Sequence, residues 1–308
     1  MTPSPALPQG GGRTRTVRAL LAYAIRKFET AGLSYGHGTT NALDEAAWLV
    51  LHATGFPLDE LNPHLDEPLP DAKYAAARRL IEERVRTRKP AAYLTNEAWL
   101  GKHRFYVDER VIVPRSYIGE LLSRQMAASE ETSPLGLDQA AVATVLDLCT
   151  GSGCIAILAA LTFADATIDA SDLSPEALEV AARNVADYGL EDRIALMQSD
   201  LFAAHAGRRY DLILANPPYV DAAALAAFPP EYAAEPRIAH AGGADGLDIV
   251  RRILAEAGAH LWPSGTLVME VGRGRPILEQ EFPHLPFLWL DTAESEGEVL
   301  ALAAHAFR

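Results

Sequence analysis

The chain has 308 residues, 49% of them hydrophobic and 22% charged, and its 27 Lys and Arg against 41 Asp and Glu give a net charge of −14. This length and composition predict a globular protein of about two domains, on the usual scale of roughly 150 residues each, and exclude a collagen, a coiled coil and a membrane protein. The acidic balance argues against a general nucleic-acid binder, because phosphate contacts require a basic surface.

The charge is divided unevenly along the chain. Up to Arg124 there are 17 basic and 14 acidic residues, a net of +3, whereas the remainder has 10 basic and 27 acidic residues, a net of −17. The second part is therefore expected to suit a basic partner or substrate.

Cysteine usage and the apolar runs indicate the compartment. Two cysteines, Cys149 and Cys154, are too few for a disulfide framework, and their spacing matches no zinc pattern, so we expect no metal site and a reducing cytoplasm. The longest apolar run, residues 155–164, is about half of what a transmembrane helix needs. Residues 1–12 lack an apolar core and are expected to be a disordered leader.

Amphipathic periodicity predicts three helices, over residues 15–31, 41–55 and 71–90. Asn41 and Asp71 are the expected N-caps of the second and third helices, which end at Gly55 and Pro90. Residues 13–90 are therefore expected to form a helical domain, which we interpret as the substrate-recognition domain.

The third helix is rich in basic side chains over residues 78–89. They are Arg78, Arg79, Arg84, Arg86, Arg88 and Lys89. A solvated helix face is one interpretation, and a contact with RNA or another phosphate-rich partner is the other. The sequence leaves both open.

Short extended segments separated by charged turns follow, at residues 98–100, 104–107 and 111–113. They predict a β-hairpin linker over residues 91–116, which closes with Val113-Pro-Arg-Ser116. The second domain is then expected to span residues 117–308, with a polar loop at 128–139.

Strand and helix patterns alternate from residue 143 onwards. The expected strands and helices are strands 143–149, 166–172, 193–197, 210–215 and 265–271, and helices 154–163, 174–189 and 244–260. Two late segments, 287–290 and 299–303, have no helix-length connection between them and are expected to pair antiparallel. The pattern predicts a doubly wound α/β sheet that binds ligands at the carboxyl ends of its strands.

A glycine turn joins the first of these strands to its helix, in Val145-Leu-Asp-Leu-Cys-Thr-Gly-Ser-Gly-Cys154. Gly151 and Gly153 remove β-carbons where a cofactor must approach the backbone. Asp147 lies inside the apolar strand, where a carboxylate is costly unless it is paired. A cation or hydroxyl of a ligand near the strand end would give it a partner.

Acidic side chains also follow the next two strands. Asp172 ends the second strand, where a carboxylate can accept ribose hydroxyls, and Asp200 after the third strand can meet an adenine amine. NAD would fit these features too. However, a dinucleotide pyrophosphate favours the helix N-terminus, whereas this pattern suits a sulfonium amino-acid cofactor.

The sequence Asn216-Pro-Pro-Tyr219 directly follows the fourth strand. The prolines fix φ and hold Asn216 in place. An amide or aromatic amine nitrogen is a poor nucleophile, because its lone pair is delocalised. If the Asn216 side-chain oxygen and the Pro217 carbonyl accept its two N–H groups, the nitrogen can become tetrahedral towards a methyl donor, and Tyr219 can pack on the substrate or the sulfonium.

Together these motifs resemble the class I S-adenosylmethionine-dependent amino-methyltransferases of the N/D-P-P-Y group. Over nearly its whole length the chain is similar to the HemK/PrmC–PrmB family of protein glutamine methyltransferases. The similarity rests on the helical first domain, Val113-Pro-Arg-Ser116, Asn216-Pro-Pro-Tyr219, Glu235-Pro236, Gly243-Ala-Asp-Gly-Leu247 and Met269-Glu-Val-Gly272. It implies a seven-stranded class I methyltransferase fold with an antiparallel last strand, preceded by a small helical domain and a β-hairpin linker.

The resemblance also implies which residues bind S-adenosylmethionine and glutamine. The implied cofactor contacts are Asp147, Cys149, Thr150, Gly151, Ser152, Gly153, Asp172, Asp200, Leu201 and Asn216. Leu201 stands where relatives often carry a tryptophan. The implied substrate contacts are Asn216, Pro217, Pro218 and Tyr219, of which Asn216, Pro217 and Tyr219 are the catalytic set. His240 is expected to be a loop residue.

Two branches of the family differ at two of these motifs. Leu148-Cys-Thr-Gly-Ser-Gly-Cys154 and Val113-Pro-Arg-Ser116 match the branch that methylates large-subunit ribosomal protein three. Methylation of a peptide-chain release factor, or of a nucleic-acid amine, stays as an alternative. The implied partner is a basic ribosomal protein, and the helix over residues 78–89 could also touch ribosomal RNA. The two cysteines are expected to be small buried residues of the turn.

Overall fold

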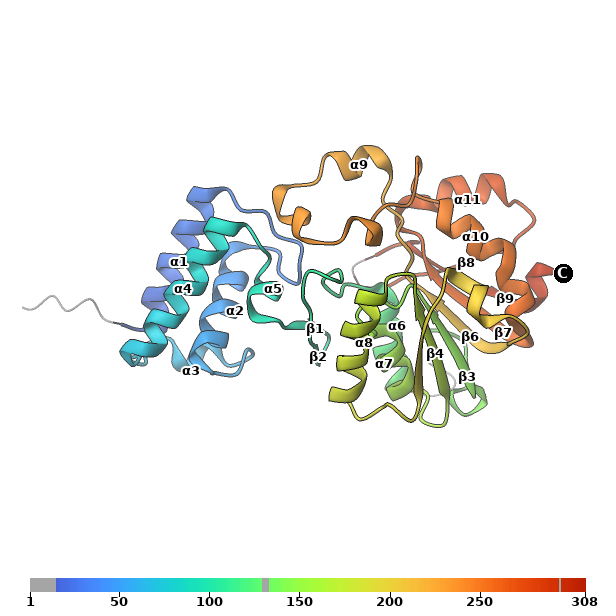
Figure 1. Cartoon of the computed structure of the whole chain (residues 1–308), viewed down its shortest axis with the longest axis horizontal. Helices are drawn as coiled ribbons and strands as arrows, with labels where there is room; N and C mark the ends of the chain where they lie inside the picture. Colours follow the sequence, from blue (N-terminus) through green and yellow to red (C-terminus); the bar gives the residue numbers. More distant parts are fainter. Residues whose placement is uncertain (1–14, 129–132, 294) are drawn as a thin grey trace, which may run out of the picture. The chain divides into compact units, whose positions relative to one another are not determined.

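A computed structural model describes residues 15–128, 133–293 and 295–308 (Figure 1). The chain divides into two compact units, Met1–Thr95 and Asn96–Arg308. The expected leader, residues 1–12, lies outside the described residues, as does part of the polar loop at 128–139. No helix among the described segments is long and apolar enough to cross a membrane.

The first unit is helical. Its helices are α1 (Val17–Ala31), α2 (Ala42–Thr54), α3 (Leu61–His64), α4 (Asp71–Thr87) and α5 (Ala91–Thr95). Asn41 caps α2 as predicted, because its side chain accepts hydrogen bonds from the backbone amides of Leu43 and Asp44 at 3.0 Å. The predicted cap at Asp71 is wrong. Pro70 holds the N-cap position, and Asp71 is the first helical residue, where its carboxylate pairs with Arg15.

Several of the basic residues of α4 are used within the first unit. Arg84 is fully buried, and its Nε lies 2.5 Å from Oε1 of Glu45, which is buried as well. Arg88, the C-cap of the helix, donates to the carbonyls of Ala31 and Gly32. The expectation of a solvated face is therefore wrong for Arg84, which cannot reach a phosphate-rich partner.

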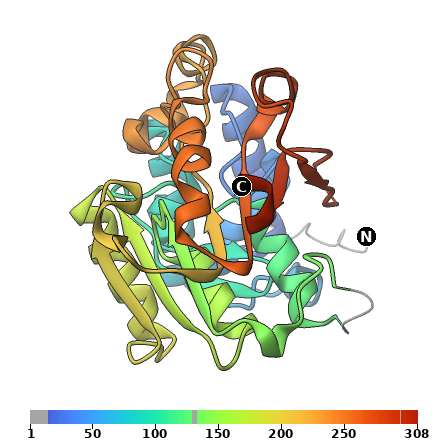
Figure 2. The ribbon, with the colours of Figure 1, turned by 90° about the vertical axis from the view of Figure 1, so that its right-hand side faces the viewer.

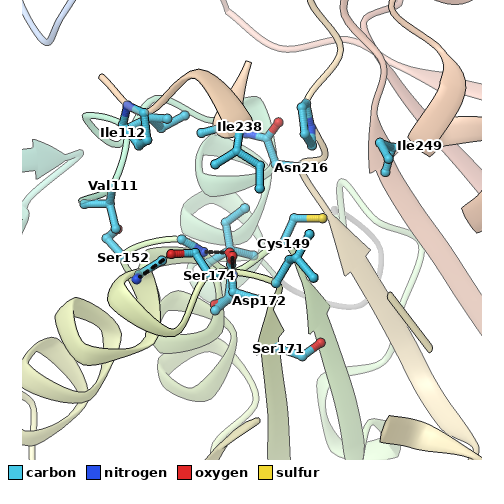
Figure 3. A pocket seen from close by; sticks show the side chains of 18 of the residues that line it. Val111, Ile112, Cys149, Ser152, Ser171, Asp172, Ser174, Asn216, Ile238 and Ile249 are labelled. Carbon is cyan, nitrogen blue, oxygen red and sulfur yellow. Dashed lines mark hydrogen bonds between the residues drawn. The ribbon is translucent and has the colours of Figure 1, made fainter. Parts of the chain in front are cut away.

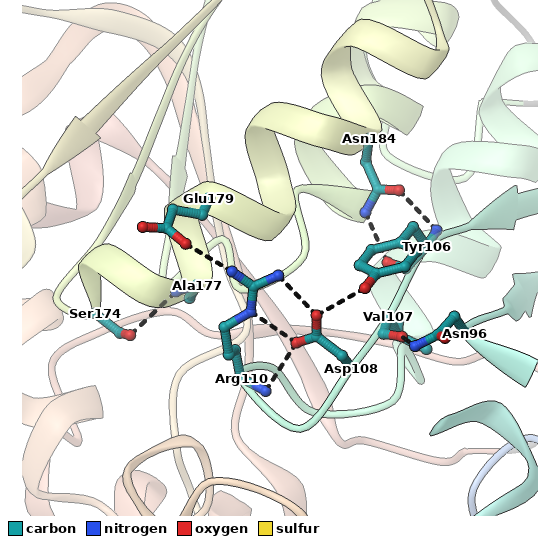
Figure 4. Close-up of polar contacts among 9 residues, drawn as sticks. All are labelled: Asn96, Tyr106, Val107, Asp108, Arg110, Ser174, Ala177, Glu179 and Asn184. Carbon is teal, nitrogen blue, oxygen red and sulfur yellow. Dashed lines mark hydrogen bonds and ion pairs between the residues drawn. The ribbon is translucent and has the colours of Figure 1, made fainter. Parts of the chain in front are cut away.

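The predicted hairpin is shorter than expected. Strands β1 (Ala98–Leu100) and β2 (His103–Phe105) pair antiparallel, whereas residues 111–113 form no strand. The ladder ends at Phe105 because the backbone of the next residue, Tyr106, is hydrogen-bonded to the side chain of Asn184 instead (Figure 4). The Tyr106 amide donates to Asn184 Oδ1 at 2.7 Å, and Asn184 Nδ2 donates to the Tyr106 carbonyl at 3.0 Å. Residues 91–95 of the expected linker form helix α5.

A seven-stranded sheet forms the centre of the second unit, in the order β5-β4-β3-β6-β7-β9-β8. The strands are β3 (Thr144–Leu148), β4 (Thr167–Asp172), β5 (Ile194–Gln198), β6 (Tyr210–Ala215), β7 (Leu261–Glu270), β8 (Leu288–Leu290) and β9 (Val299–Ala303). β9 runs antiparallel to both β7 and β8, and the pairs among β3–β7 are parallel. The predicted doubly wound fold with an antiparallel last strand is confirmed.

Helices cover both faces of this sheet (Figures 1 and 2). They are α6 (Tyr117–Met126), α7 (Cys154–Thr162), α8 (Pro175–Asp187), α10 (Asp248–Glu256) and α11 (Arg275–Glu281). The short helix α9 (Ala222–Ala226) has no buried residue and lies away from the sheet, in the segment after β6 (Figure 1). Alternate side chains of one strand enter different cores. Leu212 and Leu214 of β6 pack with the α6–α8 side, whereas Ile213 packs with the α10–α11 side.

The helix expected over residues 244–260 is shorter. α10 begins at Asp248, because Gly246 adopts a φ of +84° and the Asp248 amide bonds to the carbonyl of Gly242 at 2.9 Å. A 3-10 turn, Ala257–His260, completes the segment. Residues 243–247 are thereby left as a loop beside the turn that follows β6.

Candidate active site

A cavity of about 250 Å³ opens at the carboxyl ends of the parallel strands, within the second unit. Its wall includes Cys149, Thr150, Gly151, Ser152, Asp172, Asp200, Leu201, Asn216 and Pro218. Figure 3 shows Asn216 and Ile238 on one side of this space and Asp172 on the opposite side. Nine of the sequence-predicted site residues therefore meet around one cavity, and Asp147, Gly153, Pro217 and Tyr219 lie outside its wall.

The glycine turn contains three residues in the left-handed region. Cys149, Gly151 and Gly153 have φ values of +58°, +55° and +80°. A Cβ on Gly151 would meet no protein atom and would point into open space. A glycine is favoured at this position because its φ is positive and because a side chain would occupy the space of the cavity. A Cβ on Gly153 would lie 3.2 Å from the Cβ of Ala181 on α8. Gly153 thus allows close packing of the turn against a helix.

Asp147 is fully buried behind this turn and does not line the cavity. Its Oδ2 accepts hydrogen bonds from the Thr150 hydroxyl at 2.5 Å and from the Ala156 amide at 3.1 Å. Burial raises the pKa of the Asp147 carboxyl to about 7. The sequence predicted a group of a ligand as the partner of this carboxylate, whereas its partners in the structure are Thr150 and Ala156, through which Asp147 ties the turn to α7.

Asp172 stands at the carboxyl end of β4 and lines the cavity (Figure 3). Its Oδ2 accepts from the Gly151 amide at 2.8 Å and its Oδ1 from the Ser174 amide at 2.9 Å. Burial raises the pKa of this carboxyl above its ordinary value. One carboxylate thus fixes the glycine turn and the start of α8, and it still faces the ligand space.

Asp200 and Leu201 follow β5 on the same wall. The Asp200 carboxylate pairs with Arg252 of α10 at 2.9 Å, and both side chains are about half exposed. Leu201 is buried and has a φ of +49°. These residues offer an acceptor, a cation and an apolar surface at the edge of the cavity.

The Asn216-Pro-Pro-Tyr219 turn leaves β6 directly. The Asn216 Nδ2 donates to the carbonyl of Arg115 at 3.5 Å, which leaves its Oδ1 as an acceptor. Pro217 is buried. The ring of Tyr219 lies against Gly272, where an added Cβ would meet it at 2.7 Å, and burial raises the pKa of its phenol.

Four polar residues beside this turn, Ser116, Glu270, Arg115 and Glu235, carry no sequence signal that assigns them a role. Ser116 donates to the fully buried carboxyl of Glu270, as does the amide of Ile118 at 3.0 Å, and burial raises the pKa of Glu270 to about 7. Arg115 forms a bidentate ion pair with Glu235, at 2.8 and 2.7 Å. The motifs that contain them were recognised, but their contacts span more than a hundred residues of sequence.

The two cysteines do not provide a nucleophile. Cys154 is buried as expected, whereas Cys149 is only partly buried because it lines the cavity, so that expectation is wrong for Cys149. Desolvation raises the pKa of the Cys149 thiol well above its ordinary value and that of Cys154 to about 12, so both stay protonated near neutral pH. Within residues 15–128, 133–293 and 295–308, no group of three His, Cys, Asp or Glu side chains could hold a metal ion.

Comparisons with known proteins give one consistent result. Residues 19–95 match the PrmC N-terminal domain, and residues 135–228 match the methyltransferase small domain. The ribosomal protein uL3 glutamine methyltransferase of Bradyrhizobium diazoefficiens is 52% identical over 96% of this chain and 92% of its own length. The proteins of that name from Bordetella pertussis and Burkholderia pseudomallei are 52% and 50% identical, each over 94% of this chain and 95% of its own length.

Proposed function

Because the chain belongs to the family of ribosomal protein uL3 glutamine methyltransferases, we propose that it methylates a glutamine side-chain amide of ribosomal protein uL3 with S-adenosylmethionine. One observation of the structure carries this proposal. Asn216, at the start of the Asn-Pro-Pro-Tyr turn, faces the same cavity as the glycine turn and Asp172. The group proposed to hold the substrate amide and the residues proposed to bind the cofactor therefore line the same cavity.

The residues around the cavity fit S-adenosylmethionine, which supplies an electrophilic methyl group on a sulfonium. Open space over Gly151 and the backbone of residues 149–152 suit the amino-acid part. Asp172 would accept the ribose hydroxyls, Asp200 would meet the adenine amine and Leu201 would pack on the adenine. Asp147 and Gly153 would act from behind, by holding the turn against α7 and α8.

The substrate amide would be oriented by Asn216 and Pro217. The Asn216 Oδ1 and the Pro217 carbonyl accept the two N–H groups, which favours a tetrahedral nitrogen whose lone pair is free to attack. The proton leaves after methyl transfer, so no general base is required. Tyr219 would contribute through packing, since most of its ring is already buried against Gly272.

Charge supports a basic protein as the substrate. The chain after Arg124 carries a net charge of −17, and such a surface steers and holds a basic partner. Ribosomal RNA could contact α4, although Arg84 of that helix is buried and cannot take part. We expect this reaction to take place in the cytoplasm, on the free protein or on an assembly intermediate.

The test is to incubate the protein with labelled S-adenosylmethionine and uL3 purified from cells that lack the enzyme. We expect label on uL3 with the wild type and with Gln280→Ala, a control that removes an exposed side-chain amide from α11, away from the cavity wall. Asn216→Ala should lose at least about a hundredfold in rate, because it removes one of two acceptors that act in the transition state. Label on a release factor or in nuclease-sensitive material, and none on uL3, would overturn the proposal.

A further inference from the structure

A buried carboxylate, that of Glu235, is the centre of a polar cluster beside the cavity. Glu235 Oε1 accepts from the Val113 amide at 2.9 Å and from Arg115 Nη1 at 2.8 Å, and its Oε2 accepts from Arg115 Nη2 at 2.7 Å. His240 Nε2 lies 2.9 Å from the same Oε2. The Glu235 side chain has no exposed area, whereas 33% of the Arg115 side chain is exposed.

The two segments that Glu235 joins are both walls of the cavity. Residues 114–116 line it on one side, and Pro236, Ile238, Ala239 and Ala241 line it on another. They lie 120 residues apart in sequence, and the Arg115–Glu235 pair is the bidentate link between them. The position of each wall relative to the other therefore depends on this pair.

The same two segments hold the Asn216-Pro-Pro-Tyr turn from both of its ends. At its start, the Asn216 Nδ2 donates to the carbonyl of Arg115. Just beyond its end, the Val220 amide donates to the carbonyl of His240 at 2.9 Å, and the Gly242 amide donates to the carbonyl of Val220 at 3.0 Å. A displacement of either wall would turn the Asn216 amide or shift the Pro217 carbonyl.

We propose that Arg115 and Glu235 are positioning residues, which fix the orientation of the Asn216 side-chain amide for transfer. This inference rests on the proposed function of the site. It assigns to the pair an effect on the orientation of the substrate amide that exceeds any effect on the affinity for S-adenosylmethionine. The reason is that the Arg115 carbonyl holds Asn216, whereas the Asp172 carboxylate is held by the amide of Gly151.

The chemistry of the pair supports positioning more than stabilisation. A buried ion pair is weak evidence for stability, because desolvation offsets the attraction. A planar guanidinium that meets a carboxylate with two parallel hydrogen bonds fixes direction as well as distance, which a lysine ammonium cannot do. Arg115 is further held over the ring of Tyr232, 5.6 Å from its centroid.

The experiment compares three single variants of the full-length protein with the wild type. Arg115→Lys keeps the charge and loses the two-point geometry, and Glu235→Gln keeps the volume and loses the charge. Arg193→Lys is the matched control, because the Arg193 guanidinium also makes several hydrogen bonds, to the carbonyls of Phe163 and Ala166, and does not line the cavity. Steady-state methylation of uL3, calorimetric binding of S-adenosylmethionine and thermal melting are measured for each.

We expect kcat to fall about tenfold to a hundredfold in Arg115→Lys and Glu235→Gln, as small misplacements of a reacting group do. The Kd for S-adenosylmethionine and the KM for uL3 should stay within about threefold of the wild type, and the control should match the wild type in all of them. A kcat in both variants equal to that of the control would overturn the inference. An equal rise in the Kd for S-adenosylmethionine would also overturn it. The same holds for a loss of rate that is seen only at temperatures at which the variant unfolds. A wild-type protein that transfers no methyl group to uL3 would instead overturn the proposed function.

Discussion

Replacing Asp147 by asparagine should change how the stability of the protein depends on pH. In the folded protein, burial raises the pKa of this carboxyl from 3.8 to about 7, and its Oδ1 has no hydrogen-bond partner among the described residues. Between these two pKa values the folded state holds a proton that the unfolded chain has released. The contribution of Asp147 to the free energy of unfolding is therefore fully present below pH 3.8, and it is lost as the pH rises towards about 7.

The size of the effect follows from the two pKa values. For a shift from 3.8 to about 7, proton linkage predicts that this one group lowers the free energy of unfolding by about 2 to 3 kcal/mol between pH 5 and pH 8. An asparagine at this position cannot ionise, and its side-chain oxygen can still accept from Thr150 and Ala156. The free energy of unfolding of Asp147→Asn should therefore decrease less than that of the wild type between pH 5 and pH 8. The pKa of Glu270 is also raised to about 7, so Glu270 causes a pH-dependent decrease in the free energy of unfolding that is the same in the variant and in the wild type.

Urea denaturation at pH 5 and pH 8 measures the free energy of unfolding directly. The difference in unfolding free energy between the two pH values should be smaller in Asp147→Asn than in the wild type by about 2 to 3 kcal/mol. Asp245→Asn is the control, since Arg251 lowers the pKa of Asp245 to about 2 and the group stays ionised at both pH values. Equal pH dependence in Asp147→Asn and the wild type would refute the reasoning.

Four further outcomes are expected. Gly153→Ala should cost about 2 kcal/mol of unfolding free energy in urea, from a φ of +80° and contact with Ala181, and an unchanged midpoint would contradict this. Arg84→Leu should cost about 3 to 5 kcal/mol, because it leaves the Glu45 carboxylate buried without its ion pair, and a loss under about 1 kcal/mol would argue against it. Iodoacetamide at pH 8 should label Cys149 at least about tenfold more slowly than a free cysteine by mass spectrometry, because its thiol stays protonated, and rapid labelling would disprove the raised pKa of this thiol. The rate of uL3 methylation at limiting substrate should fall steeply with added salt, and a rate that is insensitive to salt would remove the argument from charge.

Features set by neighbouring residues were predictable from the sequence. The start of α8 needs only Ser174 as cap and Pro175 at the first position, and the strand β6 has the expected bounds. The carboxyl ends of β3, β4 and β6 converge in a parallel sheet, so the meeting of Asp172 and Asn216 at one cavity also followed from topology.

Features set by distant partners were not predictable. Residues 111–113 have the composition of a strand, but the Val113 amide bonds to Glu235 and the ladder is already broken by Asn184. The functional value of Arg115 likewise depends on a partner 120 residues away. Gly153 was expected to face a cofactor, whereas its neighbour is Ala181 of α8. The spacing of glycines shows that a close approach occurs, but it does not show whether a ligand or a helix approaches.

The proposed methylation of a glutamine amide of uL3 takes place at this cavity. Its most direct test is tandem mass spectrometry of uL3 after incubation with S-adenosylmethionine and either the wild-type protein or Asn216→Ala. We predict one added methyl group, located on the side-chain nitrogen of a glutamine, with the wild type only. A methyl group on lysine, arginine or the N-terminus, or equal methylation by Asn216→Ala, would contradict the account.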